Sequence, residues 1–268
     1  MRIVRVENTA GEVVLGCEQA DGSITRLEGD LFGTLTDTGE SVAEAKRLAP
    51  VMPCDLYCIG LNYARHAEEG GKPVPENPVV FMKSSAAVQH PGEAIALPRK
   101  LNSDKVDYEC ELVVIIGKAC KNVSREQALD YVFGYTCGND VSARDWQRNG
   151  GGGQWVRGKT FDTFAPLGPV LVTAAEIPNP NSLDIRTVLN GEVMQDWNTD
   201  DMIFDVPTLI EFLSGSTTLL PGTAIFTGTP HGVGFARKPP VYLKAGDEVT
   251  VSIDQIGDLT NPVVEESI

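Results

Sequence analysis

The clearest alternation of polar and apolar positions in this chain lies within residues 106–117. Every second position from Asp107 to Glu111 is acidic, the positions between are aromatic or apolar, and a continuous apolar run follows up to Gly117. A segment rich in β-branched and aromatic residues that ends in a glycine predicts a β-strand. Because successive side chains on a strand point to opposite faces, Asp107, Glu109 and Glu111 are predicted to share one face.

Three carboxylates on one face, directly before a run that is typical of a buried strand, are costly unless a positive charge neutralises them. A hard divalent cation with oxygen ligands would do so. The alternative is a solvent-exposed acidic face on an antiparallel strand. This segment alone does not separate the two interpretations.

Short runs of β-forming residues fill most of the remaining chain, and helical patterns are few. The pattern predicts a small N-terminal module of short strands over residues 1–50 and a larger domain over 51–268. Asn62, Ser124 and Asp205 are the expected N-caps of three helices. Short helices are predicted in four segments, 41–48, 62–69, 123–132 and 205–213.

Strands and helices do not alternate regularly, so neither a Rossmann fold nor an eight-stranded α/β barrel agrees with the pattern. The sequence predicts an α+β fold that is mostly β, with mixed, rolled sheets and few short helices.

Composition limits the classes of partner. The 268 residues carry a net charge of −15, which gives no favourable long-range field toward nucleic acid or an anionic membrane. Six cysteines show no metal-ligand spacing and are expected to be free thiols in a reducing compartment. No signal-peptide pattern or transmembrane run is present, so we expect a cytoplasmic location.

Two further features are candidates for chemistry. His66 and Glu69 are three residues apart in a predicted helix, where a carboxylate could orient the imidazole as a general base. Spacing alone equally allows a surface pair without a role. Residues 150–153 are four glycines that lack the context of a phosphate-binding loop, and we expect a mobile loop beside a site.

Several short motifs resemble one known family. In order, they are Gly60-x-Asn62-Tyr63-x-x-His66-x-x-Glu69, Phe81-x-Lys83, Tyr108-Glu109-x-Glu111-Leu112, Asp140-Val141-Ser142-Ala143-Arg144-Asp145, Gly158-Lys159-Thr160-Phe161-Asp162 and Thr227-Gly228-Thr229-Pro230-x-Gly232-Val233-Gly234. From about residue 54 onward, this order resembles the fumarylacetoacetate hydrolase family, whose fold is a β-roll. The run from Ala143 to Gln147 resembles the subgroup of animal "domain-containing protein 2" members.

The resemblance implies roles for individual residues. It implies that Glu109, Glu111 and Asp140 are the ligands of one Mg²⁺ or Mn²⁺, with Ca²⁺ as a substitute in a crystal; all-oxygen ligation favours these metals over zinc. Asp107 does not match the ligand pattern and is expected to support the ligands from behind. By the resemblance, His66, Glu69 and Lys159 are catalytic, and Arg144, Gln147 and Thr229 contact substrate. Lys159 could instead pair with Asp162, and Arg144 could bridge to Asp145 or Asp140.

The implied activity is a metal-dependent reaction of a small 2-oxo or 2,4-dioxo carboxylic acid through a metal-bound enolate. We rank C–C bond hydrolysis of an acylpyruvate first. Oxaloacetate decarboxylation, its keto–enol tautomerisation and dienoate isomerisation on the same site are the alternatives. A metal-binding or interaction module without turnover is the alternative of another class. The resemblance also implies a homodimer.

Overall fold

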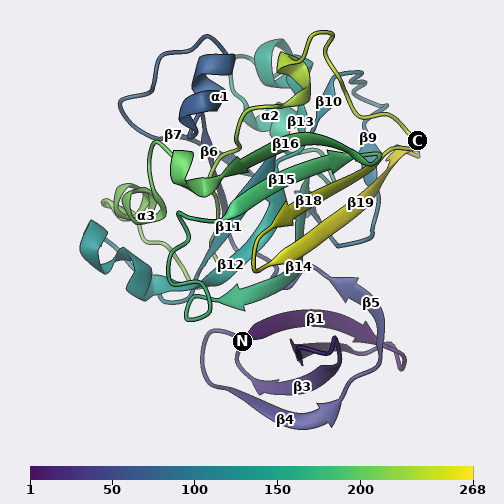
Figure 1. The fold of residues 1–268 in the computed structure, drawn as a ribbon, viewed down its shortest axis with the longest axis vertical. Coiled ribbons are helices and arrows are strands. Elements are labelled where there is room, and N and C mark those ends of the chain that lie inside the picture. The colour runs from purple at the N-terminus through teal and green to yellow at the C-terminus, as the bar shows by residue number, and fades with distance from the viewer. Residues whose placement is uncertain (268) are drawn as a thin grey trace.

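A computed structural model describes residues 1–267 of the chain. Its largest sheet extends from the N-terminal lobe, which is residues 1–50, into the rest of the molecule, which we call the body (Figure 1). Most neighbouring strands are antiparallel, but β17 and β6 are parallel, as are β14 and β8, so the sheet is mixed. Two short strands pair at its side, β5 (Glu44–Leu48) with β1 and β8 (Val88–Gln89) with β14. In spatial order its other strands are β4 (Leu35–Ser41), β3 (Ile24–Gly29), β2 (Val13–Glu18), β1 (Arg2–Asn8), β14 (Ala165–Thr173), β12 (Val132–Asn139), β11 (Cys110–Ile116), β17 (Ala224–Phe226), β6 (Leu56–Gly60) and β7 (Val79–Lys83).

A second sheet packs across β11 and β12. Its strands, in spatial order, are β16 (Glu192–Asn198), β15 (Asp184–Leu189), β18 (Glu248–Ile253), β19 (Gly257–Glu265) and β9 (Ile95–Leu97). A separate two-stranded ribbon joins β10 (Val106–Asp107) to β13 (Ser142–Ala143). The sequence-based prediction of a mostly β, α+β fold with mixed sheets is therefore confirmed.

Strand β11 is the centre of the body, because all seven of its residues are buried. Leu112 and Val114 belong to the hydrophobic core that includes residues of the second sheet, whereas Val113 and Ile115 belong to a core on the opposite face. Alternation along the strand explains this division. Glu111 is two residues before Val113, so its side chain points to the same face of β11 as Val113 and Ile115. It lies near the start of the strand.

Helices are few and short. The α-helices are α1 (Ala64–Glu69), α2 (Val156–Lys159) and α3 (Val206–Ser214), the 3₁₀ segments are Ser85–Ala87, Arg125–Tyr131, Thr199–Asp201 and Gly234–Ala236, and Trp146–Gly150 is a π-helix. Asp205 caps α3 by accepting a hydrogen bond from the Thr208 amide at 3.0 Å, as predicted. Within the described residues, no helix is long and apolar enough to cross a membrane.

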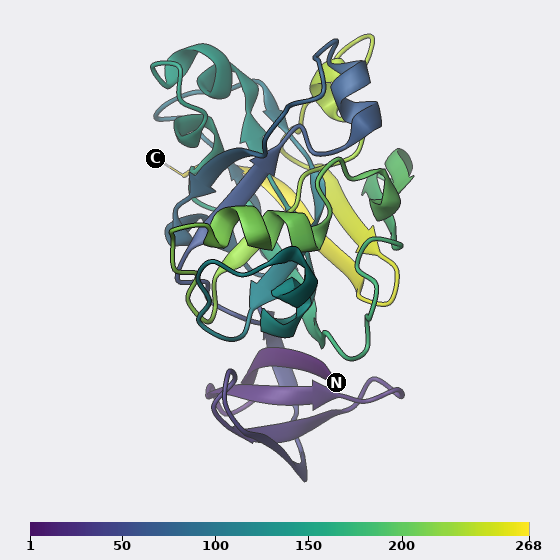
Figure 2. The same cartoon turned by 90° about the vertical axis from the view of Figure 1, so that its left-hand side faces the viewer.

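The N-terminal lobe contains only strands, and it lies outside the body in both views (Figures 1 and 2). The predicted helix over 41–48 is wrong. Its residues end β4 and form β5, whose Leu48 and Arg47 pair with Arg5 and Val6 of β1. Pairing with a neighbouring strand overrides the weak local helical preference of this segment.

The acidic strand predicted over 106–117 is divided in two. β10 ends at Asp107 and β11 begins at Cys110, with Tyr108 and Glu109 between them outside regular pairing. The Glu109 amide donates to the Asn139 side chain at 3.0 Å instead of to a neighbouring strand. The break separates Asp107 from the two glutamates that follow.

Asn62 has a different role from the predicted helix cap. Helix α1 begins two residues later and has no side-chain cap. The fully buried Asn62 amide instead donates to the carbonyls of Thr227 (2.7 Å) and Phe204 (3.0 Å), and its oxygen accepts from the Phe204 amide (2.9 Å). It therefore connects three segments that are distant in sequence.

We expect Asn62→Ala to lower the free energy of unfolding by about 2 kcal/mol or more, because it leaves buried backbone groups without partners. A denaturant titration would measure this loss. Asn149→Ala, at an exposed position, is the matched control and should change stability by less than about 0.5 kcal/mol. Equal small losses in the two variants would contradict a cross-linking role for Asn62.

Candidate functional site

Three carboxylates meet at the end of β11. Oxygen atoms of Glu109, Glu111 and Asp140 all lie within 4.8 Å of one another, and the three side chains are buried. The antiparallel register pairs Glu111 with Gly138, two residues before Asp140, and the Asp140 amide donates to the Glu109 carbonyl at 2.9 Å. The hairpin of β11 and β12 therefore brings together the two segments that carry these acids.

Lys159, on α2, lies between two of the carboxylates. Its Nζ is 2.7 Å from Glu109 Oε2 and 2.6 Å from Asp140 Oδ2. Burial lowers the pKa of Lys159, but the two carboxylates raise it by more, so the net direction is upward. The alternative partner Asp162 is not its ion-pair partner in this structure.

Lys83 is a second cation in this cluster, and the sequence analysis gave it no role. It ends β7 with its side chain fully buried, and its Nζ is 2.6 Å from Asp140 Oδ1. The same ammonium donates to the carbonyls of Val141, Lys159 and Phe164. Its only signal in the sequence is its place in the motif Phe81-x-Lys83.

All three nitrogen atoms of Arg144 donate to protein groups. Its Nε donates to Asp107 Oδ2 at 2.8 Å, Nη2 to Glu109 Oε1 at 2.6 Å, and Nη1 to Gln147 Oε1 at 3.1 Å. These partners differ from both carboxylates, Asp145 and Asp140, that the sequence left open as alternatives.

Asp107 is not one of the three converging carboxylates, but it accepts a hydrogen bond from Arg144, which in turn binds Glu109. Besides Arg144, it accepts hydrogen bonds from the amides of Gly234 (2.8 Å) and Phe235 (3.0 Å). It is fully buried and does not line the cavity described below.

Charges in this cluster do not balance. Four buried carboxylates (Asp107, Glu109, Glu111 and Asp140) face three buried cations (Lys83, Arg144 and Lys159).

Among residues 1–267, Glu111 has no ion-pair partner and accepts only from the Gly228 amide, at 2.8 Å. Burial, Asp140 and Glu109 raise the pKa of Glu111 well above its usual range. For Glu109, burial raises the pKa, but Arg144 and Lys159 outweigh it and hold the pKa well below the usual range.

The residues therefore fit a hard divalent cation. Three converging carboxylates supply only oxygen ligands, and one of them lacks a positive partner. Glu109, Glu111 and Asp140 are the groups that could hold such an ion.

His66 and Glu69 form the predicted pair on α1, at the end of the body opposite the N-terminal lobe (Figures 1 and 2). His66 Nδ1 is 3.4 Å from Glu69 Oε2, and Glu69 also accepts from the Gly232 amide at 3.0 Å. Burial raises the pKa of Glu69, whereas the bonds from His66 and Gly232 lower it by more. The backbone of the 229–232 turn thus fixes the carboxylate that orients the imidazole.

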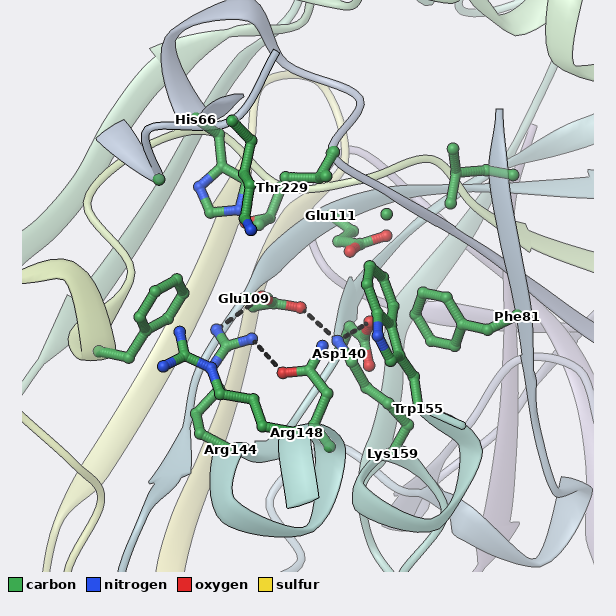
Figure 3. A pocket seen from close by; sticks show the side chains of 17 residues that line it. His66, Phe81, Glu109, Glu111, Asp140, Arg144, Arg148, Trp155, Lys159 and Thr229 are labelled. Atoms are coloured by element: carbon green, nitrogen blue, oxygen red, sulfur yellow. Dashed lines mark hydrogen bonds and ion pairs between the residues drawn. The ribbon is translucent and has the colours of Figure 1, made fainter. Parts of the chain in front are cut away.

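These groups surround one cavity of about 560 Å³. Figure 3 shows His66 on one side of the carboxylates, Arg144 and Arg148 on another, and Phe81 and Trp155 opposite the arginines. Of the nine site residues predicted from the sequence, only Glu69 does not line this cavity. The others are His66, Glu109, Glu111, Asp140, Arg144, Gln147, Lys159 and Thr229.

The sequence analysis also missed Gln195, which positions Thr229. Its buried amide donates to Thr229 Oγ1 at 2.8 Å and to the Pro230 carbonyl at 2.8 Å, and its oxygen accepts from the Cys110 amide at 3.0 Å. Since Thr229 Oγ1 accepts this bond, its hydroxyl proton remains available to the cavity. Gln195 belongs to none of the motifs, and no signal in the sequence points to it.

Comparison with known proteins identifies the family to which this chain is similar. Residues 55–264 match the family description "Fumarylacetoacetate (FAA) hydrolase C-terminal", and residues 1–50 match "Rv2993c-like, N-terminal". The chain is 49% identical over 231 residues to a fumarylacetoacetate hydrolase domain-containing protein 2 homolog from Dictyostelium discoideum, covering 83% of this chain and 75% of the relative.

One further relative is similar in sequence, and one solved structure is similar in fold. A mitochondrial oxaloacetate tautomerase from Xenopus laevis is 49% identical over 218 residues, covering 81% of this chain and 68% of the relative. A crystal structure described as 5-carboxymethyl-2-hydroxymuconate delta-isomerase from Mycobacterium smegmatis superposes with a TM-score of 0.86 at 39% identity, covering 99% of this chain and 100% of the other. This chain belongs to the fumarylacetoacetate hydrolase family.

Proposed function

We propose that this protein is a divalent-metal-dependent enzyme that forms the enolate of a 2-oxo dicarboxylic acid, with keto–enol tautomerisation of oxaloacetate as its reaction. The observation that carries the proposal is the cluster of Glu109, Glu111 and Asp140 in the floor of a cavity that also contains His66. A cation held by these carboxylates would polarise the 2-oxo group and stabilise the negative charge of the enolate. We take Mg²⁺ or Mn²⁺ as the candidates.

The His66–Glu69 pair supplies the proton transfer. Glu69 accepts from one ring nitrogen, Nδ1, which leaves Nε2 free for the cavity. That nitrogen takes the proton from C3 of the keto acid and, in the reverse direction, returns it to C3 of the enol. The enol oxygen gains or loses its proton through solvent. The C2=O double bond of the keto form becomes the C2=C3 double bond of the enol, and the only σ bonds made or broken are C–H and O–H.

Lys159 and Thr229 have positioning roles in this scheme. The Lys159 ammonium pairs with Glu109 and Asp140 and offsets their negative charge next to the cavity. The Thr229 hydroxyl, held from behind by Gln195, can donate to a substrate oxygen.

Relatives support this reaction class through their names. The Xenopus laevis relative is named an oxaloacetate tautomerase, and the Mycobacterium smegmatis structure is described as an isomerase of an unsaturated hydroxy acid. Keto–enol tautomerisation moves a proton to or from the carbon next to the 2-oxo group, which is the step proposed for His66.

C–C bond hydrolysis of an acylpyruvate, which the sequence analysis ranked first, remains the second candidate. It is favoured by the apolar wall of the cavity, where Phe81 and Trp155 lie 5.6 Å apart between ring centroids and could contact an acyl chain. In that reaction His66 and Glu69 would activate a water molecule instead of removing a proton from C3.

We also propose a homodimer. Strand β7 is an edge of the large sheet and exposes Val80 and Met82, and α2, which packs against β7, exposes Val156. Apolar side chains gathered at an edge strand are typical of a covered surface.

Turnover with and without metal tests the proposal. The ultraviolet absorbance of the enol of oxaloacetate should decay faster with the protein and Mg²⁺, and a chelator should abolish the acceleration. Cleavage of acetylpyruvate without any effect on the enol would favour the hydrolase instead. The absence of both activities would contradict an enzyme of either kind.

We expect Glu111→Gln to weaken Mg²⁺ binding by about 100-fold or more, because it removes the charge of one ligand. In the absence of metal the same variant should be at least as stable as the parent, because Glu111 has no positive partner among the described residues. Calorimetry and thermal melts would measure the two effects. Glu192→Gln, which is exposed at the start of β16, is the control and should change neither quantity.

His66→Ala should lower kcat for enol–keto conversion by about 100-fold or more, since it removes the proton-transfer group. It should leave Mg²⁺ affinity within about twofold, because His66 is not among the three converging acids. His90→Ala, outside the cavity, should leave turnover unchanged. Unchanged turnover in His66→Ala would contradict the assigned base.

A further inference from the structure

One arginine that lines the cavity has no carboxylate partner. Arg148 lies on the π-helix Trp146–Gly150 and is exposed, and none of the ion pairs around the cavity in the described part of the chain includes it. Its neighbour Arg144 contacts the protein through all three of its nitrogen atoms. A substrate carboxylate that enters the cavity therefore finds a free guanidinium at Arg148 rather than at Arg144.

The guanidinium of Arg148 lies over an aromatic ring. Its guanidinium carbon lies 4.8 Å from the centroid of Phe235, and that of Arg144 lies 4.5 Å from the same centroid. The Phe235 amide in turn donates to Asp107 at 3.0 Å. Arg148 is thus held on the side of the cavity where Arg144 lies (Figure 3), although its side chain is accessible to solvent.

The start of this π-helix is also held. Asp145 Oδ1 accepts from the Trp146 amide at 2.9 Å and from the Ser103 hydroxyl at 2.7 Å. The segment that presents Arg148 is therefore connected to the body independently of the glycine run that follows.

The two walls of the cavity differ in chemistry. Arg148 and Arg144 lie on one side, whereas Phe81 and Trp155 lie on the other (Figure 3). The floor carries the three acids that would hold the metal. A guanidinium presents several N–H groups in a planar fork that matches a carboxylate, and this geometry is better suited to orientation than a point charge.

We propose that Arg148 binds the carboxylate at the far end of the substrate and selects dicarboxylic over monocarboxylic 2-oxo acids. The assignment rests on the proposed function, in which the near end of the substrate lies over Glu109, Glu111 and Asp140. Arg148 is a specificity-determining residue and takes no part in proton transfer.

The test compares ligands that differ only in the second carboxylate. L-malate and L-lactate are 2-hydroxy acids that cannot enolise, so their binding to the Mg²⁺-loaded protein can be measured by calorimetry without turnover. We expect Arg148→Met to weaken malate binding by about tenfold and to leave lactate binding within about twofold. Arg148→Lys should fall between the parent and Arg148→Met, because it keeps the charge but loses the fork.

Arg157→Met is the matched control. Arg157 belongs to the same region, stacks on Phe161 with its guanidinium carbon 4.4 Å from the ring centroid, and does not line the cavity. Removing its charge should leave the ratio of malate to lactate affinity unchanged. In turnover, Arg148→Met should raise KM for oxaloacetate about tenfold and change kcat by less than about threefold.

Equal effects of Arg148→Met on malate affinity and lactate affinity would overturn the assignment. A loss of malate affinity in Arg157→Met as large as that in Arg148→Met would also overturn it, because it would indicate a long-range electrostatic effect instead of a direct contact. These outcomes leave the proposed function intact if the parent protein converts the enol of oxaloacetate. A parent protein that binds neither acid and turns over no 2-oxo acid would overturn the proposed function, and the role of Arg148 with it.

Discussion

The structure depends on a buried cluster of charges that its own residues do not neutralise. Lys83, Arg144 and Lys159 each pair with at least one of four buried acids, and Glu111 has no positive partner among the described residues, so that burial and the neighbouring acids raise its pKa well above the usual range. Burying an unpaired carboxylate costs several kcal/mol. The hydrophobic cores on both faces of β11 offset this free-energy cost, because they stabilise the strand that carries Glu111. The rigidity of the strand keeps the acids close to one another in spite of their repulsion.

Part of this site can be read from the sequence by physical reasoning alone. Alternation along a strand places Glu109 and Glu111 on one side, and the buried run that follows makes the cost of their charge evident. Asp140 and Lys159 could not be found in this way, because they approach from β12 and α2 and their contacts depend on tertiary structure. Motif resemblance identified both, since the order of the motifs reflects a fold that brings them together. The exclusion of a Rossmann fold and of a barrel needed only the absence of regular alternation between strands and helices.

The errors have physical causes of the same kind. Residues 41–48 were predicted as a helix, but pairing with β1 outweighs a local preference that is worth only a fraction of a kcal/mol per residue. Asn is a residue type that often caps helices, but the side-chain amide of Asn62 instead bonds buried backbone groups of Phe204 and Thr227. These partners are distant in sequence, so the local pattern around Asn62 does not predict them. The sequence left Asp145 and Asp140 open as partners of Arg144, whereas its pairing with Asp107 and Glu109 is a property of the assembled site. Which arginine is free is decided by neighbours, and Arg148 has no motif of its own.

Helix α1 shows how the two halves of the site are connected. Six residues are too few for an isolated helix to be stable in water, so α1 depends on contacts at both of its ends. At the start, Asn62 is bonded to the Thr227 carbonyl, and at the end Glu69 accepts from the Gly232 amide. Both partners belong to the segment 227–232, which also presents Thr229 to the cavity. His66 and the Thr229 hydroxyl are therefore positioned by one stretch of backbone, and a displacement of that stretch would move both groups relative to the three converging carboxylates.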